Sequence, residues 1–203
     1  MKTETSVASD HSGRWVLLLV AAMFFFPVIG SIVLFHSGWR PASQVNHGEL
    51  VQPARLLSET TLATLDGRVM HLSQLQKKWT MLYFGPADCN AACQHRLYIM
   101  RQVHIAQGAE ADRIQRVYVA TGPGPLDVLQ KDYPKMLILT GTADNIRQLA
   151  AQFQLPAGSP LDGLGRMYLV DPAGYFMMSY PADAPGDGMR RDMVRLLKIS
   201  KAD

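Results

Sequence analysis

Apolar and polar positions divide the chain into one long uncharged run and a patterned region after it. Residues 15–35 contain no charged side chain, whereas residues 1–14 are mostly polar. A helix rises about 1.5 Å per residue, so this run spans the roughly 30 Å hydrocarbon core of a bilayer. Trp15 and Trp39 flank the run, as aromatic side chains often do at membrane interfaces. The pattern predicts a transmembrane helix over residues 15–35 behind a cytoplasmic tail over residues 1–14.

A cleaved signal peptide is the alternative explanation of this run. Its apolar part would be shorter, and small residues at a cleavage site should follow. Residues 34–39 read Leu-Phe-His-Ser-Gly-Trp, which offers no such site, so we expect the helix to be retained as an anchor. Lys2 and Arg14 before the run are balanced by Arg40 and Arg55 after it. The distribution of basic residues therefore does not fix the orientation, although a short tail before a long trailing segment is compatible with a cytoplasmic N-terminus.

The rest of the chain divides into a linker and a single domain. Residues 36–58 hold prolines, glycines and polar side chains, which predicts a linker whose end packs on the domain. From residue 59 onward, apolar positions switch between the periods of strands and of helices. The predicted strands are residues 61–65, 68–72, 79–84, 116–120, 136–140, 166–171 and 175–180. The predicted helices are residues 73–77, 89–107, 126–131, 143–153 and 188–199. Strands alternating with helices predict an α/β sheet over residues 59–203, with a final hairpin at its edge, which is the plan of a thioredoxin-like domain.

Length and charge narrow the classes of function. A chain of 203 residues allows one ordinary domain plus an anchor. The net charge of +3 comes without a basic cluster, so we expect no nucleic-acid partner. The sequence contains no phosphate-binding glycine loop followed by Lys and no metalloprotease motif. What remains as candidate chemistry is a pair of cysteines.

Cys89 and Cys93 lie four residues apart, directly after the predicted buried strand over residues 79–84. A disulfide closing so short a loop would constrain the unfolded chain very little, so the spacing favours redox or metal chemistry over stapling. We expect Asp88 to cap the following helix, which would put Cys89 at its first position. The helix dipole there would lower the pKa of a thiol, although the charge of Asp88 would oppose this. The alternative is that both cysteines are small core residues.

The two thiols are the candidate catalytic and metal-binding groups. Residues four apart on a helix share one face, so the sulfurs of Cys89 and Cys93 can reach each other or one common ion. A soft dithiolate suits Cu(I), and a close pair equally suits thiol–disulfide exchange. His95 is expected to point away from the pair, His104 to lie too far along the helix, and His71 to approach only through folding. The eleven Met residues form no Met-x-x-Met cluster. Met23 lies in the apolar run, and Met100, Met136 and Met167 fit the core faces of their elements.

These residues resemble the SCO/SenC family, membrane-anchored thioredoxin-like proteins that help to build the copper site of cytochrome c oxidase. Family members have a strand ending in Phe-Gly, a short turn, and Cys-x-x-x-Cys opening a helix. Here Phe84 and Gly85 precede Cys89 and Cys93. Residues 167–174 are similar to the family's late strand and turn. The resemblance covers the region from about residue 59 to the end and includes the anchor.

Two departures from the family pattern bear on the metal. Asn90 and Gln94 stand where members have Pro after each cysteine. Gly163 stands where members have a distal His that completes a three-ligand copper site, and no His follows His104. The resemblance therefore implies a divergent member with a two-thiolate Cu(I) site or a purely redox dithiol, in place of a stable Cu(II) site.

The resemblance also implies a pathway and a location. It implies a factor in cytochrome c oxidase biogenesis, anchored in the inner membrane with its C-terminal domain in the periplasm, whose partners are an oxidase subunit or other assembly factors. Cys89 and Cys93 would deliver copper or reduce thiols at the oxidase copper site. The alternatives are a membrane-bound thiol–disulfide oxidoreductase with other clients and a non-catalytic assembly scaffold. The residues alone leave the choice between enzyme and carrier open.

Overall fold

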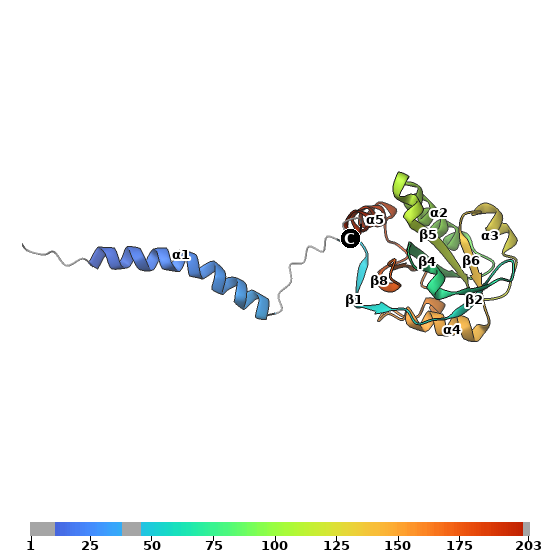
Figure 1. The fold of residues 1–203 in the computed structure, drawn as a ribbon, viewed down its shortest axis with the longest axis horizontal. Coiled ribbons are helices and arrows are strands. Elements are labelled where there is room, and N and C mark those ends of the chain that lie inside the picture. Colours follow the sequence, from blue (N-terminus) through green and yellow to red (C-terminus); the bar gives the residue numbers. More distant parts are fainter. Residues whose placement is uncertain (1–10, 38–45, 201–203) are drawn as a thin grey trace, which may run out of the picture. The chain divides into compact units, whose positions relative to one another are not determined.

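A computed structural model describes residues 11–37 and 46–200 of the chain, which form two separate units. The first unit holds the helix α1 (His11–His36), whose apolar part has a mean hydropathy of 2.7 and is long enough to cross a membrane (Figure 1). The predicted apolar helix is therefore confirmed, and it begins within the last residues assigned to the tail. The remainder of that tail, residues 1–10, lies outside the described residues.

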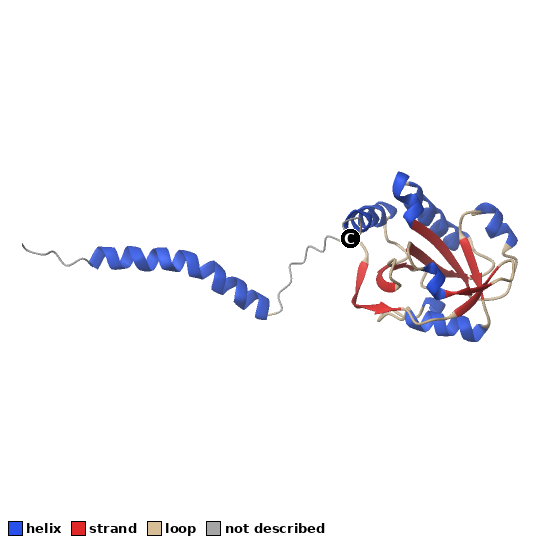
Figure 2. Ribbon diagram, viewed as in Figure 1, coloured by secondary structure: helices blue, strands red, loops and turns tan. Residues whose placement is uncertain are grey.

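The second unit is built on one mixed sheet of eight strands (Figure 2). The strands are β1 (Glu49–Leu56), β2 (Thr61–Thr64), β3 (Val69–His71), β4 (Trp79–Gly85), β5 (Ile114–Ala120), β6 (Leu137–Thr140), β7 (Met167–Val170) and β8 (Tyr175–Tyr180). The helices are α2 (Ala91–Ile105), α3 (Asp127–Asp132), α4 (Ala143–Gln152) and α5 (Gly186–Ile199), with short 3-10 turns η1 (Leu72–Leu75), η2 (Gly108–Arg113) and η3 (Pro160–Asp162). The order across the sheet is β1-β8-β7-β4-β5-β6-β2-β3. Every predicted strand and helix is present, with ends shifted by at most two residues.

Helices cover both faces of this sheet, so the core consists of two clusters, one on each face (Figure 1). On one face, apolar residues of α2, α3 and α5, among them Leu97, Leu129 and Met193, pack on the strands. On the other face, α4 and η1 contribute Leu149 and Leu75. The central strand β4 is buried along its whole length, because both faces are covered. The predicted α/β sheet is confirmed, but the final hairpin of β7 and β8 does not lie at its edge, because β1 pairs with β8 on the outside.

The predicted linker over residues 36–58 is wrong in its second half. Residues 49–56 form the edge strand β1, which pairs antiparallel with β8. The sequence pattern does not predict this strand, because none of its residues is fully buried and Pro53 interrupts the alternation. Proline is tolerated in edge strands. Its start is fixed by the buried carboxylate of Asp192 on α5, which accepts hydrogen bonds from the backbone N–H groups of His47 and Gly48, both at 2.9 Å. The described domain therefore begins more than ten residues earlier than residue 59.

Candidate functional site

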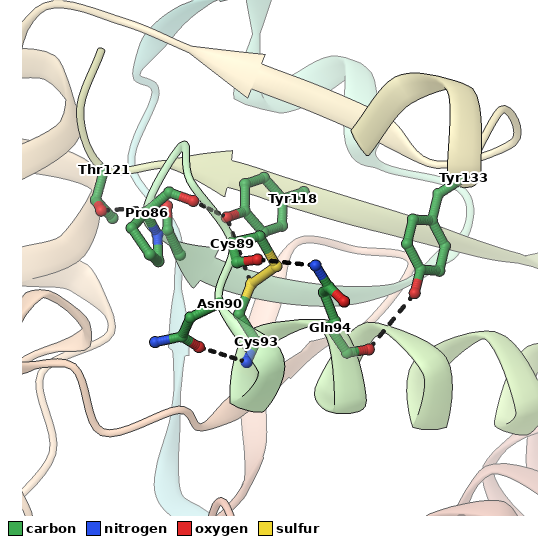
Figure 3. The surroundings of a disulfide bond; sticks show 9 residues. Pro86, Cys89, Asn90, Cys93, Gln94, Tyr118, Thr121 and Tyr133 are labelled. Carbon is green, nitrogen blue, oxygen red and sulfur yellow. Dashed lines mark hydrogen bonds between the residues drawn. A yellow bond between two sulfur atoms is a disulfide. The ribbon is translucent and has the colours of Figure 1, made fainter. Parts of the chain in front are cut away.

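The two cysteines lie where β4 ends and α2 begins, and they are joined as a disulfide (Figure 3). Their Cα atoms are 5.3 Å apart. Cys89 is 9% exposed and Cys93 is 2% exposed, so Cys89 is the sulfur nearer to solvent. The carboxyl ends of strands are the usual place for chemistry in α/β sheets. The structure thus brings the two predicted site residues together at such an end.

The cap of α2 differs from the prediction. Asn90, not Asp88, caps the helix, because its side-chain oxygen accepts a hydrogen bond from the backbone N–H of Cys93 at 3.0 Å. Asp88 and Asn90 are both good capping residues, and the pattern could not choose between them. Cys89 therefore precedes the helix, while Cys93 lies in its first turn. The helix dipole acts on Cys93 more directly than on Cys89, which reverses the expected asymmetry.

Tyr118 on β5 places a hydroxyl beside the buried sulfur. Its oxygen lies 3.7 Å from the sulfur of Cys93, and its proton is donated to the carbonyl of Pro86 at 2.5 Å (Figure 3). Burial, with smaller contributions from Tyr83 and Asp88, raises the pKa of Tyr118 far above its usual range. The hydroxyl therefore stays protonated at neutral pH and can act as a donor. No sequence motif pointed to this residue, because it lies on a different strand from the cysteines.

Gly85, the last residue of β4, leaves room for that tyrosine. A Cβ atom at this position would lie 2.5 Å from the hydroxyl oxygen of Tyr118 and 2.8 Å from the ring of Tyr83. Any larger residue would push the tyrosine rings away from the turn that carries the cysteines. The Phe-Gly end of the strand therefore has a packing reason in this chain.

A separate cavity opens on each side of the disulfide. The cavity on the Cys93 side, of about 340 Å³, includes Asn90, Arg96 and Gly163 in its lining. The cavity on the Cys89 side, of about 260 Å³, lies between the start of α2 and α3. Each sulfur thus faces its own cavity.

Of the three histidines considered, only His95 lies differently from expectation. His95, expected to point away from the pair, lines the cavity on the Cys93 side. His71 lies on β3, at the far end of the sheet order from β1, and lines neither cavity. His104 sits near the end of α2, where burial and the nearby Arg116 lower its pKa. Gly163, which the sequence aligns with the family's distal His, has a positive φ of 70° and lines the cavity on the Cys93 side, and a glycine has no donor side chain.

The donor set available for copper consists of the two thiolates of the reduced pair. Among the described residues, no group of three or more His, Cys, Asp or Glu could hold a metal ion. Soft thiolates suit Cu(I), so Cys89 and Cys93 fit a two-thiolate Cu(I) site. They do not fit the three-ligand site of the family pattern.

Comparison with known proteins places this site in context. The family model described as "Transmembrane-like, thioredoxin-like, C-terminal domain" matches residues 79–200. The chain is 26% identical over 156 residues to the mitochondrial SCO2 homolog of Bos taurus, and the match covers 66% of this chain and 58% of the bovine protein.

Solved structures of SCO proteins share the fold. Copper-bound ScoI of Arabidopsis thaliana superposes with a TM-score of 0.60 at 20% identity, covering 71% of this chain and 99% of that one. BsSco, described as having a disulfide switch and as a member of the Sco family of cytochrome c oxidase assembly proteins, gives 0.57 at 18% identity, covering 72% and 95%. The expected thioredoxin-like fold and the resemblance to SCO proteins are confirmed. This chain belongs to the family of transmembrane-like proteins with a thioredoxin-like C-terminal domain.

Proposed function

We propose that this chain is a membrane-anchored factor in cytochrome c oxidase biogenesis that acts through the Cys89–Cys93 dithiol. The observation that carries the proposal is a close cysteine pair at the carboxyl end of β4, in a domain similar to SCO proteins. The apolar helix α1 supplies the anchor. Disulfides persist in oxidising compartments, which favours a periplasmic domain on an inner-membrane anchor.

One branch of this function is the transfer of Cu(I) as cargo. The reduced sulfurs of Cys89 and Cys93 offer two soft ligands, and the described residues add no third. A site of only two ligands leaves the ion open to an incoming thiolate of an acceptor protein. Such a site suits hand-over better than storage.

The other branch is the reduction of a disulfide at the copper-binding cysteines of the oxidase. The thiolate of Cys89 attacks one sulfur of the client disulfide and releases the other as a thiolate. Cys93 then attacks Cys89, which closes the Cys89–Cys93 disulfide and frees the second client sulfur. Two electrons pass to the client, and the two protons of the dithiol end on the client thiols. A second dithiol protein must then reduce the pair again.

The division of labour between the sulfurs follows from their surroundings. Cys89 is the more exposed sulfur and faces the cavity beside α3, so it is the one that a client can reach. Cys93 is buried beside the hydroxyl of Tyr118 and lies in the first turn of α2. Both features stabilise a thiolate on Cys93. Cys93 is therefore the better internal leaving and resolving group.

The test is oxidase activity in cells that lack the chromosomal gene. The wild-type chain should restore activity, whereas Cys89→Ser and Cys93→Ser should not. Cys93→Ser should in addition accumulate a mixed disulfide with the client, and Cys89→Ser should not. Restoration by the double Ser variant would contradict the proposal and leave only an assembly scaffold.

Cu(I) binding by the purified, reduced chain, compared with the activity of the same variants in cells, separates the branches. Cu(I) delivery requires one Cu(I) per chain, bound by the wild type and lost in either Ser variant. Activity that depends on the cysteines without Cu(I) binding would favour thiol reduction. The chain is a thiol–disulfide oxidoreductase with other clients if two results coincide. The purified chain reduces disulfides of other proteins, and cells that lack the chromosomal gene keep normal oxidase activity.

A further inference from the structure

The two cavities beside the disulfide differ in charge. Among the described residues lining the cavity on the Cys89 side are Asp88 and Asp132, and no Lys, Arg or His is among them. The lining on the Cys93 side includes His95 and Arg96, with no Asp or Glu. The disulfide therefore separates an acidic cavity from a basic one. A client that reaches Cys89 must enter the acidic cavity.

The two carboxylates of that cavity are available to a partner. Asp88 and Asp132 are exposed, and neither forms an ion pair or a side-chain hydrogen bond with another described residue. Lys131 and Lys135 neighbour Asp132 in the sequence but do not line the cavity. A charge without a partner beside a reactive sulfur selects among incoming segments.

The rest of the lining is mostly apolar. Ala87 and Leu129 are buried in its wall. Val128 on α3 is 65% exposed and also belongs to the lining. An apolar surface with carboxylates at its rim matches a segment that carries both an apolar and a cationic side chain.

We propose that the cavity on the Cys89 side docks a client segment in which the reacting cysteine is flanked by an apolar residue and by Lys or Arg. The apolar side chain packs on Val128 and Leu129, and the cation pairs with Asp132 or Asp88. The client cysteine then meets Cys89, because Cys93 is almost fully buried on the other side. This inference rests on the proposed function and names the chemistry of its partner.

The test uses the full-length Cys93→Ser chain in detergent and short peptides whose single cysteine is activated as an aromatic disulfide. Two peptides share one apolar residue beside the cysteine and differ only in a neighbouring Lys or Glu. The rate of mixed-disulfide formation with Cys89 should be higher for the Lys peptide, and the ratio should shrink as salt is added. Exposed charge pairs suggest a change of about twofold to fivefold per aspartate.

Three variants on this background assign the effect to the cavity. Asp132→Asn and Asp88→Asn should each reduce the Lys-to-Glu rate ratio. Asp127→Asn is the matched control, because Asp127 carries the same charge on the same helix α3 without lining the cavity, and it should leave the ratio unchanged. Using the ratio removes any general effect of Asp88 on the reactivity of Cys89.

Equal rates for the two peptides, or a faster Glu peptide, would overturn this inference while leaving the dithiol function intact. An equal fall of the ratio in Asp127→Asn would also overturn it, since the effect would then belong to the whole surface. If no peptide forms a mixed disulfide with Cys89, the thiol-reduction branch of the proposed function fails, and this inference fails with it.

Discussion

Tyr118 and Cys93 illustrate how single side chains set the chemistry of the pair. In the oxidised chain the hydroxyl of Tyr118 donates to the carbonyl of Pro86, while the sulfur of Cys93 lies 3.7 Å away. Reduction turns that sulfur into a thiol or a thiolate, and a thiolate is a much better acceptor than a disulfide sulfur. The hydroxyl can then turn to the thiolate, and this stabilises the reduced form.

Tyr118→Phe should therefore make the disulfide harder to reduce. A hydrogen bond to a charged group contributes about 1.5–3 kcal/mol, so the equilibrium constant for reduction by a reference dithiol should fall by roughly tenfold. The measurement is the redox equilibrium of the full chain at neutral pH. Tyr168→Phe is the control, because Tyr168 is also buried and its hydroxyl has no hydrogen-bond partner among the described residues. Equal shifts in both variants would show that packing, not the donor, sets the potential.

At the scale of elements, what the sequence could predict depended on burial. The strand β4 is buried throughout, so it appears as an unbroken apolar run, and the amphipathic helices α4 and α5 appear with their period. The strand β1 lies at an edge with mostly exposed side chains, and nothing in its pattern marks it. The cysteines were found because they are close in sequence. Tyr118 and Asp132 were missed because only the fold brings them to the site.

The attachment of β1 to α5 depends on one buried carboxylate. Asp192 is 2% exposed and accepts hydrogen bonds from His47, Gly48 and the hydroxyl of Tyr180. Asp192→Asn should destabilise the domain by about 2–4 kcal/mol, since charged hydrogen bonds are lost and buried donors compete for one acceptor. The measurement is the denaturant midpoint of the full chain. Asp187→Asn on the same helix is the control: its ion pairs are exposed, so a matching loss there would contradict the assignment.

The end of α2 should make the domain sensitive to acid. Burial and then the charge of Arg116 lower the pKa of His104 below its ordinary value of 6.5, so the folded chain binds this proton less readily than the unfolded chain. The stability that comes from neutral His104 is therefore complete above pH 6.5 and is lost as the pH falls through the lowered pKa. His104→Gln should flatten the fall of the denaturant midpoint between neutral and mildly acidic pH. An unchanged slope in His104→Gln would refute the assignment.

At the scale of the whole molecule, the described residues combine an apolar helix that is long enough to cross a membrane with a thioredoxin-like domain. Basic residues are nearly equal in number on the two sides of the helix, so their distribution does not determine its orientation, and another argument is needed. The proposed role in oxidase assembly supplies one, because disulfides form and persist mainly in oxidising compartments outside the cytoplasm. The domain is therefore expected outside the cytoplasm.

A reporter fused after Asp203 tests that orientation directly. A phosphatase that folds only outside the cytoplasm should be active in the fusion, and a reporter confined to the cytoplasm should be inactive. The same two reporters fused to a chain from which α1 has been removed provide the control, because a chain without the apolar helix should remain in the cytoplasm. The reverse pattern in the full-length fusions would remove both the periplasmic location and the oxidase as a client.

Because β1 is the edge strand nearest to the N-terminus of the domain, it is also the strand that receives a mechanical force applied to the preceding chain. A pull on the chain before β1 reaches the sheet at β1, where the hydrogen bonds from the N–H groups of His47 and Gly48 to Asp192 take the force first. If they yield, β1 peels from β8, while β8 and β7 still separate the loaded edge from β4. Two strands thus lie between the loaded edge and β4, the strand that positions the cysteines, so strain at β1 can be absorbed without disturbing the geometry of the sulfurs.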